Sequence, residues 1–291
     1  MSCRQTRILF GPLLLLSAAC ASTQPTVVVG SPSGAEAQAQ QTERATPHDN
    51  LDAVLWQQTS SEYEAVTRQT FRMAERLLEE ALADTTWTAA LEQGEGYGSL
   101  PPAIIADVDE TVLTHAVFQG HMILKGQSFT EELWYPWVLA ARGIAMPGAR
   151  EFVAAAHRMG VTVFYVTNHD HAIEPGTRRN LEEVGLGPLP DFDTVLTRWE
   201  REEWTSDKSS RRAEVASKYR VLLLLGDDLN DFVLASLPDT ERDQIMADNV
   251  GKWGRRWLMF PNPMYGNWMG AIPVRAGNDR TQRKLDALEQ P

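Results

Sequence analysis

The chain has 291 residues, 43% of them hydrophobic, which is enough to bury one substantial core. Its formal net charge is −12, and no segment supplies the basic stripe that a nucleic acid polymer needs. Composition therefore argues against polymer binding, although a locally positive pocket could still bind a small phosphate. It leaves the oligomeric state open.

Residues 1–19 have the pattern of a secretory signal. Two arginines precede an apolar run over residues 8–16, and small residues follow in "LSAAC". That run is too short to span a bilayer as a permanent helix. Cys20 lies where cleavage would leave it first in the mature chain, an arrangement that resembles a bacterial lipobox. We therefore expect lipidation of Cys20, with an ordinary signal peptide as the alternative.

Cysteine usage fits an exported chain without a disulfide. Cys3 would be removed with the signal, so Cys20 has no partner within the mature chain. A lipidated cysteine without a transmembrane helix tethers a protein to one membrane face. Residues 20–48 are rich in Ser, Thr, Gln, Ala, Pro and Gly, which predicts a flexible tether. We expect an outer membrane lipoprotein of the bacterial cell envelope, facing the periplasm or the surface.

Residues 49–100 are predicted to form an N-terminal helical region. Thr59 and Glu62 have the spacing of a capping box that begins an amphipathic helix. The apolar positions that follow recur at steps of three and four residues and predict its buried face: Tyr63, Val66, Thr70, Ala74, Leu77, Leu78 and Ala81. No titratable cluster lies on this helix, so we interpret it as scaffold.

The main domain is predicted over residues 101–280, followed by a tail over 281–291. Four short runs rich in Val, Ile and Leu alternate there with helix-like sequence, at residues 103–107, 161–168, 221–228 and 256–263. This alternation predicts an α/β fold whose parallel sheet is buried on both faces and flanked by helices. Ligands of such folds bind beyond the carboxyl ends of the strands.

Unusual polar residues lie at these strand ends: Asp107, Asp109, Thr167, Asn168, Asp227 and Asp231. Carboxylates gathered there would repel one another unless they were protonated, lay at helix N-termini or surrounded a cation. Oxygen ligands without cysteine favour a hard ion such as Mg²⁺. One acidic motif alone could equally be a helix N-cap, but two acidic strand ends with a suitable Thr and Lys favour a site.

Four motifs in this order resemble those of the haloacid dehalogenase (HAD) superfamily: "DVDET" the nucleophile motif, "VFYVTN" the second, "SDKSSR" the lysine motif and "GDDLND" the metal motif. More narrowly, "AVLWQQTSSEY", "MPGAREF" and "PNPMYGNW" make the chain similar to the class C acid phosphatases, bacterial surface lipoproteins that act on nucleotides and other phosphomonoesters. The resemblance covers residues 50 to 270. It implies a HAD-like Rossmannoid sheet with a small, mainly helical insertion at about 112–146.

The resemblance also implies a mechanism. Asp107 would attack phosphorus and form an aspartyl-phosphate. Asp109 would begin protonated, which favours acidic pH, and act first as general acid and then as general base. Thr167 and Lys208 would bind the phosphoryl oxygens. A lysine in the first turn of a helix is disfavoured by the helix dipole unless an anion binds there, which supports this role for Lys208.

The implied metal is Mg²⁺, held by the Asp107 carboxylate, the Asp109 backbone carbonyl and Asp227. Asp231 would hold the water molecules of the metal. The neighbours of Lys208, Arg211 and Arg212, are expected on a solvated face.

The substrate side departs from the relatives. After the nucleophile their pattern is close to Asp-Asn-Ser-Pro-Tyr-x-x-Trp, whereas this chain has "THAVFQGH", with Phe118 for one aromatic residue and His121 where the Trp is expected. In the relatives, aromatic residues clamp a nucleoside or aryl group. The expected substrate-binding residues are Asn168, Phe118, His121, Tyr265 and Trp268. His169 and His171 are expected at the surface, with a metal pair as the alternative.

The leading hypothesis is an exported Mg²⁺-dependent acid phosphatase or 5′-nucleotidase acting on small phosphomonoesters. Two other hypotheses remain. A phosphonatase of the same superfamily would need a Schiff-base lysine, for which Lys125 is the candidate. A surface lipoprotein that binds haem or a host ligand would carry a relic active site.

Overall fold

The computed structural model describes residues 49–234, 239–272 and 284–288. The predicted signal, Cys20 and the tether lie outside these residues, as does most of the predicted tail. Among the described helices, none is both long and apolar enough to cross a bilayer.

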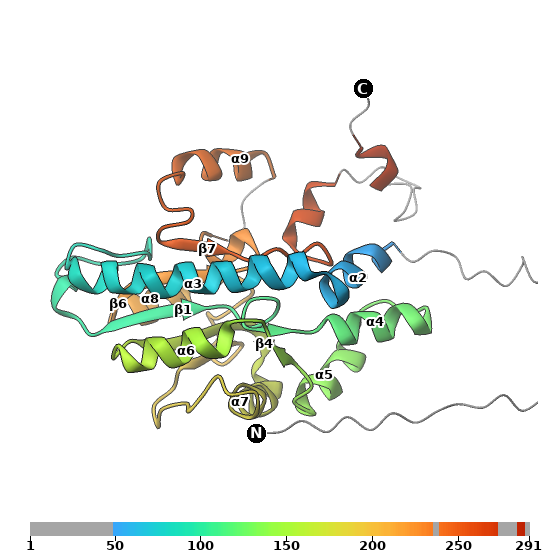
Figure 1. Ribbon diagram of the computed structural model, residues 1–291, viewed down its shortest axis with the longest axis horizontal. Helices are drawn as coiled ribbons and strands as arrows, with labels where there is room; N and C mark the ends of the chain where they lie inside the picture. Colours follow the sequence, from blue (N-terminus) through green and yellow to red (C-terminus); the bar gives the residue numbers. More distant parts are fainter. Residues whose placement is uncertain (1–48, 235–238, 273–283, 289–291) are drawn as a thin grey trace, which may run out of the picture. The chain divides into compact units, whose positions relative to one another are not determined.

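A five-stranded parallel sheet forms the centre of the described chain, with strand order β5-β4-β1-β6-β7. Its strands are β1 (Pro102–Ala106), β4 (Thr162–Asp170), β5 (Val195–Arg198), β6 (Arg220–Gly226) and β7 (Trp257–Met259). The predicted α/β class is therefore confirmed (Figure 1). Strand β5 was not among the predicted runs, since its four residues are too few to show a pattern.

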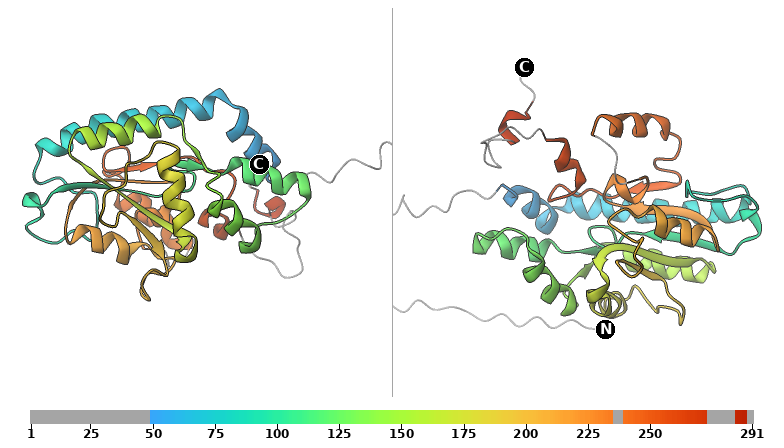
Figure 2. Two further views of the ribbon diagram at one scale, coloured as in Figure 1. Left: turned by 90° about the horizontal axis from the view of Figure 1, so that it is seen from below. Right: turned by 180° about the vertical axis from the view of Figure 1, so that it is seen from behind.

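Helices cover both faces of this sheet. Helices α3 (Ser61–Ala83) and α6 (Ala149–Arg158) lie together on one face, and α8 (Ser209–Ala216) lies on the other (Figure 2). Helix α7 (Glu174–Glu183) packs against β4 and β5. Neighbouring residues of β1 face opposite ways, so that Ile104 belongs to the core under α3 and Ile105 to the core under α8.

The remaining elements lie at the edges of this sandwich. Three helices gather beyond the carboxyl ends of the strands, namely α2 (Leu51–Thr59), α4 (Ala116–Lys125) and α5 (Glu131–Leu139) (Figure 1). The insertion that carries α4 and α5 is closed by the antiparallel pair β2 (Leu113–Thr114) and β3 (Ile144–Ala145). The other described elements are α9 (Asp239–Asp248) and the 3₁₀ turns η1 (Tyr97–Ser99), η2 (His171–Ile173), η3 (Leu229–Asp231) and η4 (Asn267–Ala271).

Helix α3 begins one residue later than the predicted capping box. The side chain of Ser60, not Thr59, accepts a hydrogen bond from the Tyr63 backbone N–H at 3.0 Å. The buried face is also rotated from the predicted one, because Phe71 is buried whereas Val66 is exposed. The helix has 23 residues and packs against α6, β6 and β7, as expected of a scaffold element.

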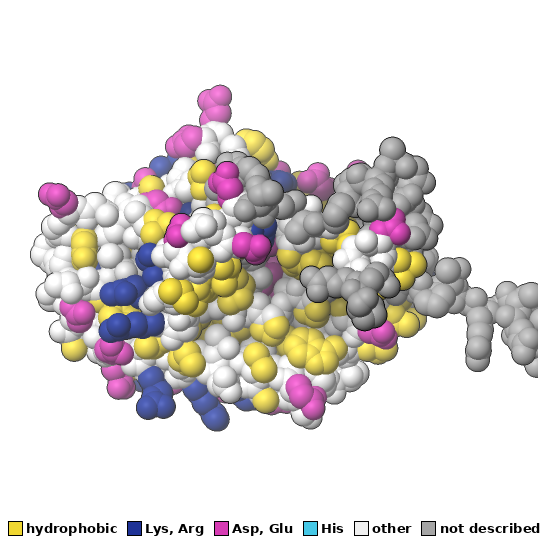
Figure 3. All heavy atoms as spheres, turned by 90° about the horizontal axis from the view of Figure 1, so that it is seen from above, with side chains coloured by type: hydrophobic (Ala, Val, Ile, Leu, Met, Phe, Trp, Pro, Cys, Tyr) yellow, Lys and Arg dark blue, Asp and Glu magenta, His cyan; other side chains and the backbone are white. Residues whose placement is uncertain are grey.

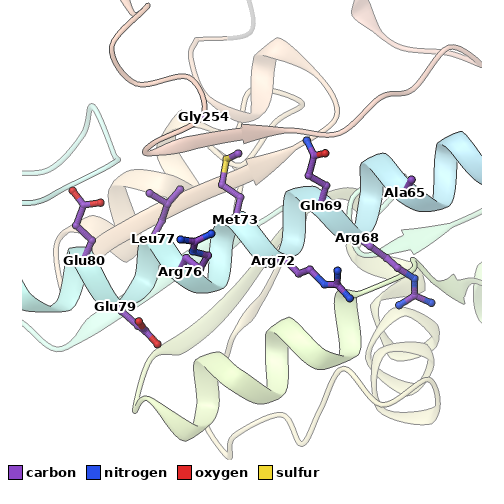
Figure 4. A pocket seen from close by; sticks show the side chains of 10 residues that line it. All are labelled: Ala65, Arg68, Gln69, Arg72, Met73, Arg76, Leu77, Glu79, Glu80 and Gly254. Atoms are coloured by element: carbon purple, nitrogen blue, oxygen red, sulfur yellow. The ribbon is translucent and has the colours of Figure 1, made fainter.

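The outer side of α3 lines an open groove of about 970 Å³. Gln69 and Met73 point to one side of the helix, and Arg68 and Arg72 point to the other (Figure 4). Glu79 and Glu80 lie in the same groove, so its charge is mixed. On the face seen from above, basic side chains gather toward the left and hydrophobic side chains lie beside them (Figure 3).

Candidate active site

The sheet order brings three distant motifs together. Strand β1 lies between β4 and β6, and Asp107 follows the last residue of β1. Thr167 lies near the end of β4, and Asp227 follows β6. The Asp107 backbone N–H donates to the Leu225 carbonyl at 2.9 Å, which fixes the start of the nucleophile loop against β6.

Lys208 pairs with two carboxylates in the buried base of the site. Its Nζ donates to Asp107 Oδ1 and, at 2.7 Å, to Asp231 Oδ1. Burial alone would lower the pKa of Lys208, but the charges of Asp107 and Asp231 raise it above its usual range. The lysine is therefore an ammonium ion held against the predicted nucleophile.

The carboxylates of Asp107, Asp227 and Asp231 form a cluster suited to a divalent cation. One oxygen from each lies within 4.8 Å of the others. Burial raises the pKa of Asp107 to about 7, against the opposing effect of Lys208 and with repulsion from Asp231 and Asp109. Burial and repulsion from Asp107 and Asp231 likewise raise the pKa of Asp227 well above its usual range. One ammonium ion does not balance three carboxylates, and an all-oxygen donor set fits a hard cation.

Asp231 is fixed on both of its oxygens. Its Oδ1 accepts a hydrogen bond from Lys208 Nζ. Its Oδ2 accepts hydrogen bonds from the backbone N–H groups of Asp227 at 3.1 Å and Asp228 at 3.0 Å. The carboxylate also presses on Gly226, where a Cβ atom would lie 2.3 Å from Asp231 Oδ2. The glycine and the two spaced acids of "GDDLND" are thus parts of one packing arrangement.

Arg211 and Arg212 are buried, so the prediction of a solvated face was wrong. Arg211 donates to the Thr167 carbonyl and, at 2.7 Å, to Asn168 Oδ1. Arg212 pairs with Glu92 at 2.7 Å. The two guanidinium groups tie the lysine loop to segments far away in the chain, and no local pattern in the sequence reveals such partners.

The Asp109 carboxylate lies between two buried histidines. His169 Nε2 is 2.8 Å from Asp109 Oδ2, and His115 Nε2 is 2.8 Å from Asp109 Oδ1. Burial alone would raise the pKa of Asp109, but His169 and His115 lower it below its usual range. This direction is opposite to the initially protonated Asp109 that we expected. His169 is not at the surface as predicted, whereas His171 is half exposed and pairs with Glu174 at 2.7 Å.

Comparison with known proteins agrees with this geometry. Residues 15–268 match the model of the family described as HAD superfamily, subfamily IIIB (acid phosphatase). The chain belongs to this family. It is similar to two structures of the class C acid phosphatase from Bacillus anthracis, each at 28% identity over 83% of this chain and 97% of that chain. The TM-score is 0.71 for the structure with tungstate bound and 0.70 for the other. The protein is thus an acid phosphatase, a phosphoric monoester hydrolase with a HAD-like fold.

A pocket of about 450 Å³ opens beside Asp109 in this acid phosphatase. Its walls come from the chain preceding α2, the α4–α5 insertion, the end of β4 and the segment after β7: Asn50, Asp109, Gln119, Met122, Gln127, Ser128, Phe129, Trp134, Asn168, His169, Met264, Tyr265, Gly266 and Met269. None of these lining residues is a lysine or an arginine. The pocket therefore suits an uncharged, largely apolar group beside Asp109.

The predicted substrate residues divide between this pocket and its surroundings. Asn168 and Tyr265 line it. Phe118 is buried behind the wall with its ring 5.1 Å from that of Trp134. His121 is exposed on α4 and is not part of the lining, and Trp268 donates to the Tyr265 carbonyl at 3.2 Å from outside it.

Sequence reasoning missed Trp134 and Phe129, which supply the aromatic wall. Their one signal is the density of aromatic residues in "FTEELWYPW", within an insertion that has no clear period.

Glu110 is a further residue that the sequence analysis missed. Its side chain is fully buried and its φ is +55°, an uncommon backbone conformation for this residue. Glu110 Oε1 accepts the His115 backbone N–H at 2.8 Å, and its other oxygen accepts from Gln57 of α2. Burial raises the pKa of Glu110. The sequence analysis passed over Glu110 because it directly follows Asp107 and Asp109, the two acidic residues to which the motif assigns roles.

Proposed function

We propose that this acid phosphatase is Mg²⁺-dependent and hydrolyses phosphomonoesters with uncharged apolar or aromatic leaving groups, such as aryl phosphates and 5′-nucleotides, through an aspartyl-phosphate. The observation that carries the proposal is the buried contact of Lys208 with Asp107, two residues before Asp109, which itself lines a largely apolar pocket. The side with Lys208 and Asp107 is suited to the phosphoryl group, and the pocket side is suited to the leaving group.

In the first step, an Asp107 oxygen attacks phosphorus while the bond from phosphorus to the leaving oxygen breaks. Lys208 keeps a positive charge beside the transferring group, where negative charge must be stabilised. Thr167 lies near the end of the neighbouring strand β4 and contributes polar groups to the phosphoryl site. The protonated Asp109 carboxyl group donates its proton to the leaving oxygen and is left as a carboxylate, with His169 Nε2 2.8 Å from Asp109 Oδ2.

In the second step, water attacks the aspartyl-phosphate. Asp109 accepts the water proton, phosphate is released and the Asp107 carboxylate is restored. An Asp109 held as a carboxylate is prepared for this step, because a base must be unprotonated before it acts. The histidine contacts that lower the pKa of Asp109 therefore favour the second step most directly.

Asp107 and Asp227 would hold Mg²⁺, with the Asp109 backbone carbonyl as the third protein ligand that the family resemblance implies. When bound, the ion polarises the phosphoryl oxygens and screens them from the nucleophile. Asn262 donates to Asp227 Oδ2 at 2.8 Å and leaves the other Asp227 oxygen available. Asp231 is occupied by Lys208 and two backbone N–H groups, so we assign it a supporting role.

The leaving group would occupy the pocket of about 450 Å³. Trp134, Phe129 and Tyr265 offer aromatic surfaces on which an aryl ring or a base can stack. Because no lysine or arginine lines this pocket, a second phosphate on the leaving group would lack a partner. Monophosphates should therefore be better substrates than diphosphates.

The decisive experiment compares purified wild type with Asp107→Asn on p-nitrophenyl phosphate, 5′-mononucleotides and a sugar phosphate, with Mg²⁺ or with a chelator. We expect Mg²⁺-dependent hydrolysis by wild type and loss of at least about 10⁴-fold in the variant. Full activity in Asp107→Asn, or equal activity with the chelator, would contradict the proposal.

A phosphonatase is the weaker reading, because Lys125 is exposed at the end of α4 and does not line the pocket. Borohydride trapping in the presence of a phosphonate substrate checks this directly. Covalent capture of substrate on Lys125 would favour the phosphonatase.

We also propose that residues 1–19 are removed and that Cys20 is lipidated and anchored in the outer membrane. The signal and lipobox pattern support this location. Cys20→Ser should move the phosphatase from the membrane fraction to the soluble fraction. Mass spectrometry of the mature N-terminus provides the second readout, and an unmodified Cys20 in the wild type would refute the anchor.

A further inference from the structure

His115 stands in a line of contacts that runs from α5 to Asp109. On one side of its ring, the Trp137 indole Nε1–H lies 2.9 Å from His115 Nδ1. On the other side, His115 Nε2 lies 2.8 Å from Asp109 Oδ1. The imidazole is 1% exposed, so water does not compete for either nitrogen.

Trp137 decides which nitrogen of His115 carries a proton. An indole N–H can only donate a hydrogen bond, so His115 Nδ1 must accept it and cannot itself be protonated. The ring proton of His115 is therefore on Nε2, facing Asp109. His169 is less restricted, because its Nδ1 contacts the Thr177 hydroxyl at 2.7 Å and a hydroxyl can either donate or accept.

The surroundings of His115 hold the ring in this position. Its backbone N–H donates to the buried Glu110 carboxylate at 2.8 Å. Behind the ring lies Gly143, where a Cβ atom would come within 2.8 Å of His115 Cε1. Asn180 fixes Gly143 by accepting its N–H at 2.7 Å and donating to its carbonyl at 2.9 Å.

A metal site is the competing interpretation, since Asp109, His115 and His169 bring three potential ligand atoms within 4.8 Å of one another. A nitrogen ligates a metal through its lone pair, and the Nε2 of His115 carries the proton as long as Trp137 donates to Nδ1. A ligating histidine instead donates its other N–H to an acceptor, the reverse of what Trp137 offers. The Trp137 contact therefore argues against a three-ligand centre.

His115 Nε2 is buried and has no aligned hydrogen-bond acceptor, although Asp109 Oδ1 is at contact distance. Contacts of this kind are often poorly aligned before substrate binds and tighten in the complex.

We propose that His115, fixed in its Nε2–H tautomer by Trp137, is the positioning residue for Asp109 and sets the direction in which Asp109 faces the leaving oxygen. This inference rests on the proposed function, in which Asp109 transfers the proton. Trp137 couples the α5 helix of the insertion to the chemistry at the end of β1.

Two substitutions of nearly the same size separate the two nitrogens of His115. In His115→Gln, the side-chain amide reaches the former Nε2 position and can donate to Asp109. In His115→Asn, the shorter amide reaches only the former Nδ1 position, so it can meet Trp137 but not Asp109. Trp137→Phe keeps an aromatic ring against Phe118 and removes the indole N–H together with part of the ring system.

The readout is kcat/KM for two substrates with aromatic rings, one whose leaving group needs a proton (benzyl phosphate) and one whose leaving group needs little help (p-nitrophenyl phosphate). His115→Asn should lose about 10- to 100-fold on benzyl phosphate, the usual cost of removing an orienting partner, and under about 3-fold on p-nitrophenyl phosphate. His115→Gln should recover most of the benzyl phosphate activity. Trp137→Phe should fall between His115→Asn and His115→Gln.

Three outcomes would overturn the inference. The first is an equal loss on both substrates, which indicates a merely structural role. The second is unchanged activity of His115→Asn on both substrates. The third is Zn²⁺ bound by the Mg²⁺-saturated wild type and lost in His115→Asn, measured by equilibrium dialysis, which indicates a metal centre. Asp107→Asn is measured in parallel to separate the two proposals. If Asp107→Asn is inactive but the His115 variants show no dependence on the leaving group, only the positioning role of His115 is refuted.

Discussion

The two halves of the active site are built differently. The phosphoryl half consists of charged residues at strand ends, with Asp107, Lys208 and Asp231 buried and paired with one another. The leaving-group half is made of aromatic and imidazole side chains from the insertion and its neighbours, such as Trp134 and His115. The first half depends on the parallel sheet, and the second depends on how loops and short helices pack over it. Phosphoryl binding and substrate preference therefore rest on different parts of the chain, which meet at the contact of His115 with Asp109.

The phosphoryl half should be the more sensitive to substitution. In Lys208→Met, Asp107 and Asp231 lose their shared cation, and activity should fall by about 10³-fold. Removing one partner of a buried ion pair should also lower the free energy of unfolding by about 3 to 5 kcal/mol. Urea denaturation and steady-state kinetics measure the two effects.

Lys218→Met is the matched control, since Lys218 makes an exposed pair with Glu214 at 2.6 Å. Its effect on the free energy of unfolding should stay below about 1 kcal/mol. Similar losses in both lysine variants would contradict the special role of the buried pair.

Gly226→Ala tests the same half without removing a charge. The new Cβ would lie 2.3 to 2.6 Å from atoms of the Asp231 side chain and force it away from Lys208. We expect a loss of about 1 to 3 kcal/mol in the free energy of unfolding, with reduced activity. Gly251→Ala is the control, because nothing lies within 4 Å of its added Cβ. If Gly226→Ala has the activity of wild type, Asp231 does not need its observed position.

The pH dependence of stability tests the charge balance of the phosphoryl half. The pKa of Asp107 is about 7 in the folded chain against 3.8 for an ordinary aspartate, so the folded state binds this proton more tightly than the unfolded state. In metal-free protein the resulting stability is present below about pH 4 and is lost as the pH rises toward 7. Asp107→Asn should lack this pH-dependent contribution to the free energy of unfolding. Thermal melts of wild type and variant across this pH range measure the contribution as the difference between them.

Mg²⁺ should reverse the trend, because a cation binds the ionised cluster more tightly. The increase in Tm on adding Mg²⁺ should therefore grow from pH 4 to pH 7. An increase that is the same throughout this range would place the bound ion away from Asp107.

The leaving-group half should respond through substrate preference. In Trp134→Ala, an aromatic wall of the pocket is lost, and kcat/KM for phenyl phosphate should fall by about 10-fold, while that for methyl phosphate changes much less. Trp268→Ala serves as the control from outside the lining. Equal losses on phenyl and methyl phosphate would show that Trp134 supports the fold of the insertion rather than the ring of the substrate.

The same contrast explains what the sequence could predict. The fold and the charged residues at the strand ends could be predicted. Apolar runs indicate buried parallel strands, and the carboxyl ends of parallel strands meet at one edge of the sheet. Strand β5 was missed because it is short, and the burial of Arg211 was missed because its partners Thr167 and Asn168 come from a distant segment. Trp134 of α5 lines the pocket and His115, just before α4, contacts Asp109 only because the insertion packs over the strand ends, and such packing leaves no periodic signal.

His121 provides the smallest expected effect and the sharpest check on the leaving-group half. By motif position it stands where the relatives have a tryptophan, yet it is exposed on α4 and absent from the pocket lining. His121→Ala should therefore change kcat/KM for aryl phosphates and nucleotides by less than about 2-fold, as is usual for a surface substitution away from special features. A loss as large as that of Trp134→Ala would mean that α4 turns His121 toward the substrate when it binds. In that case motif position, rather than the packing seen without substrate, would be the better guide to this half of the site.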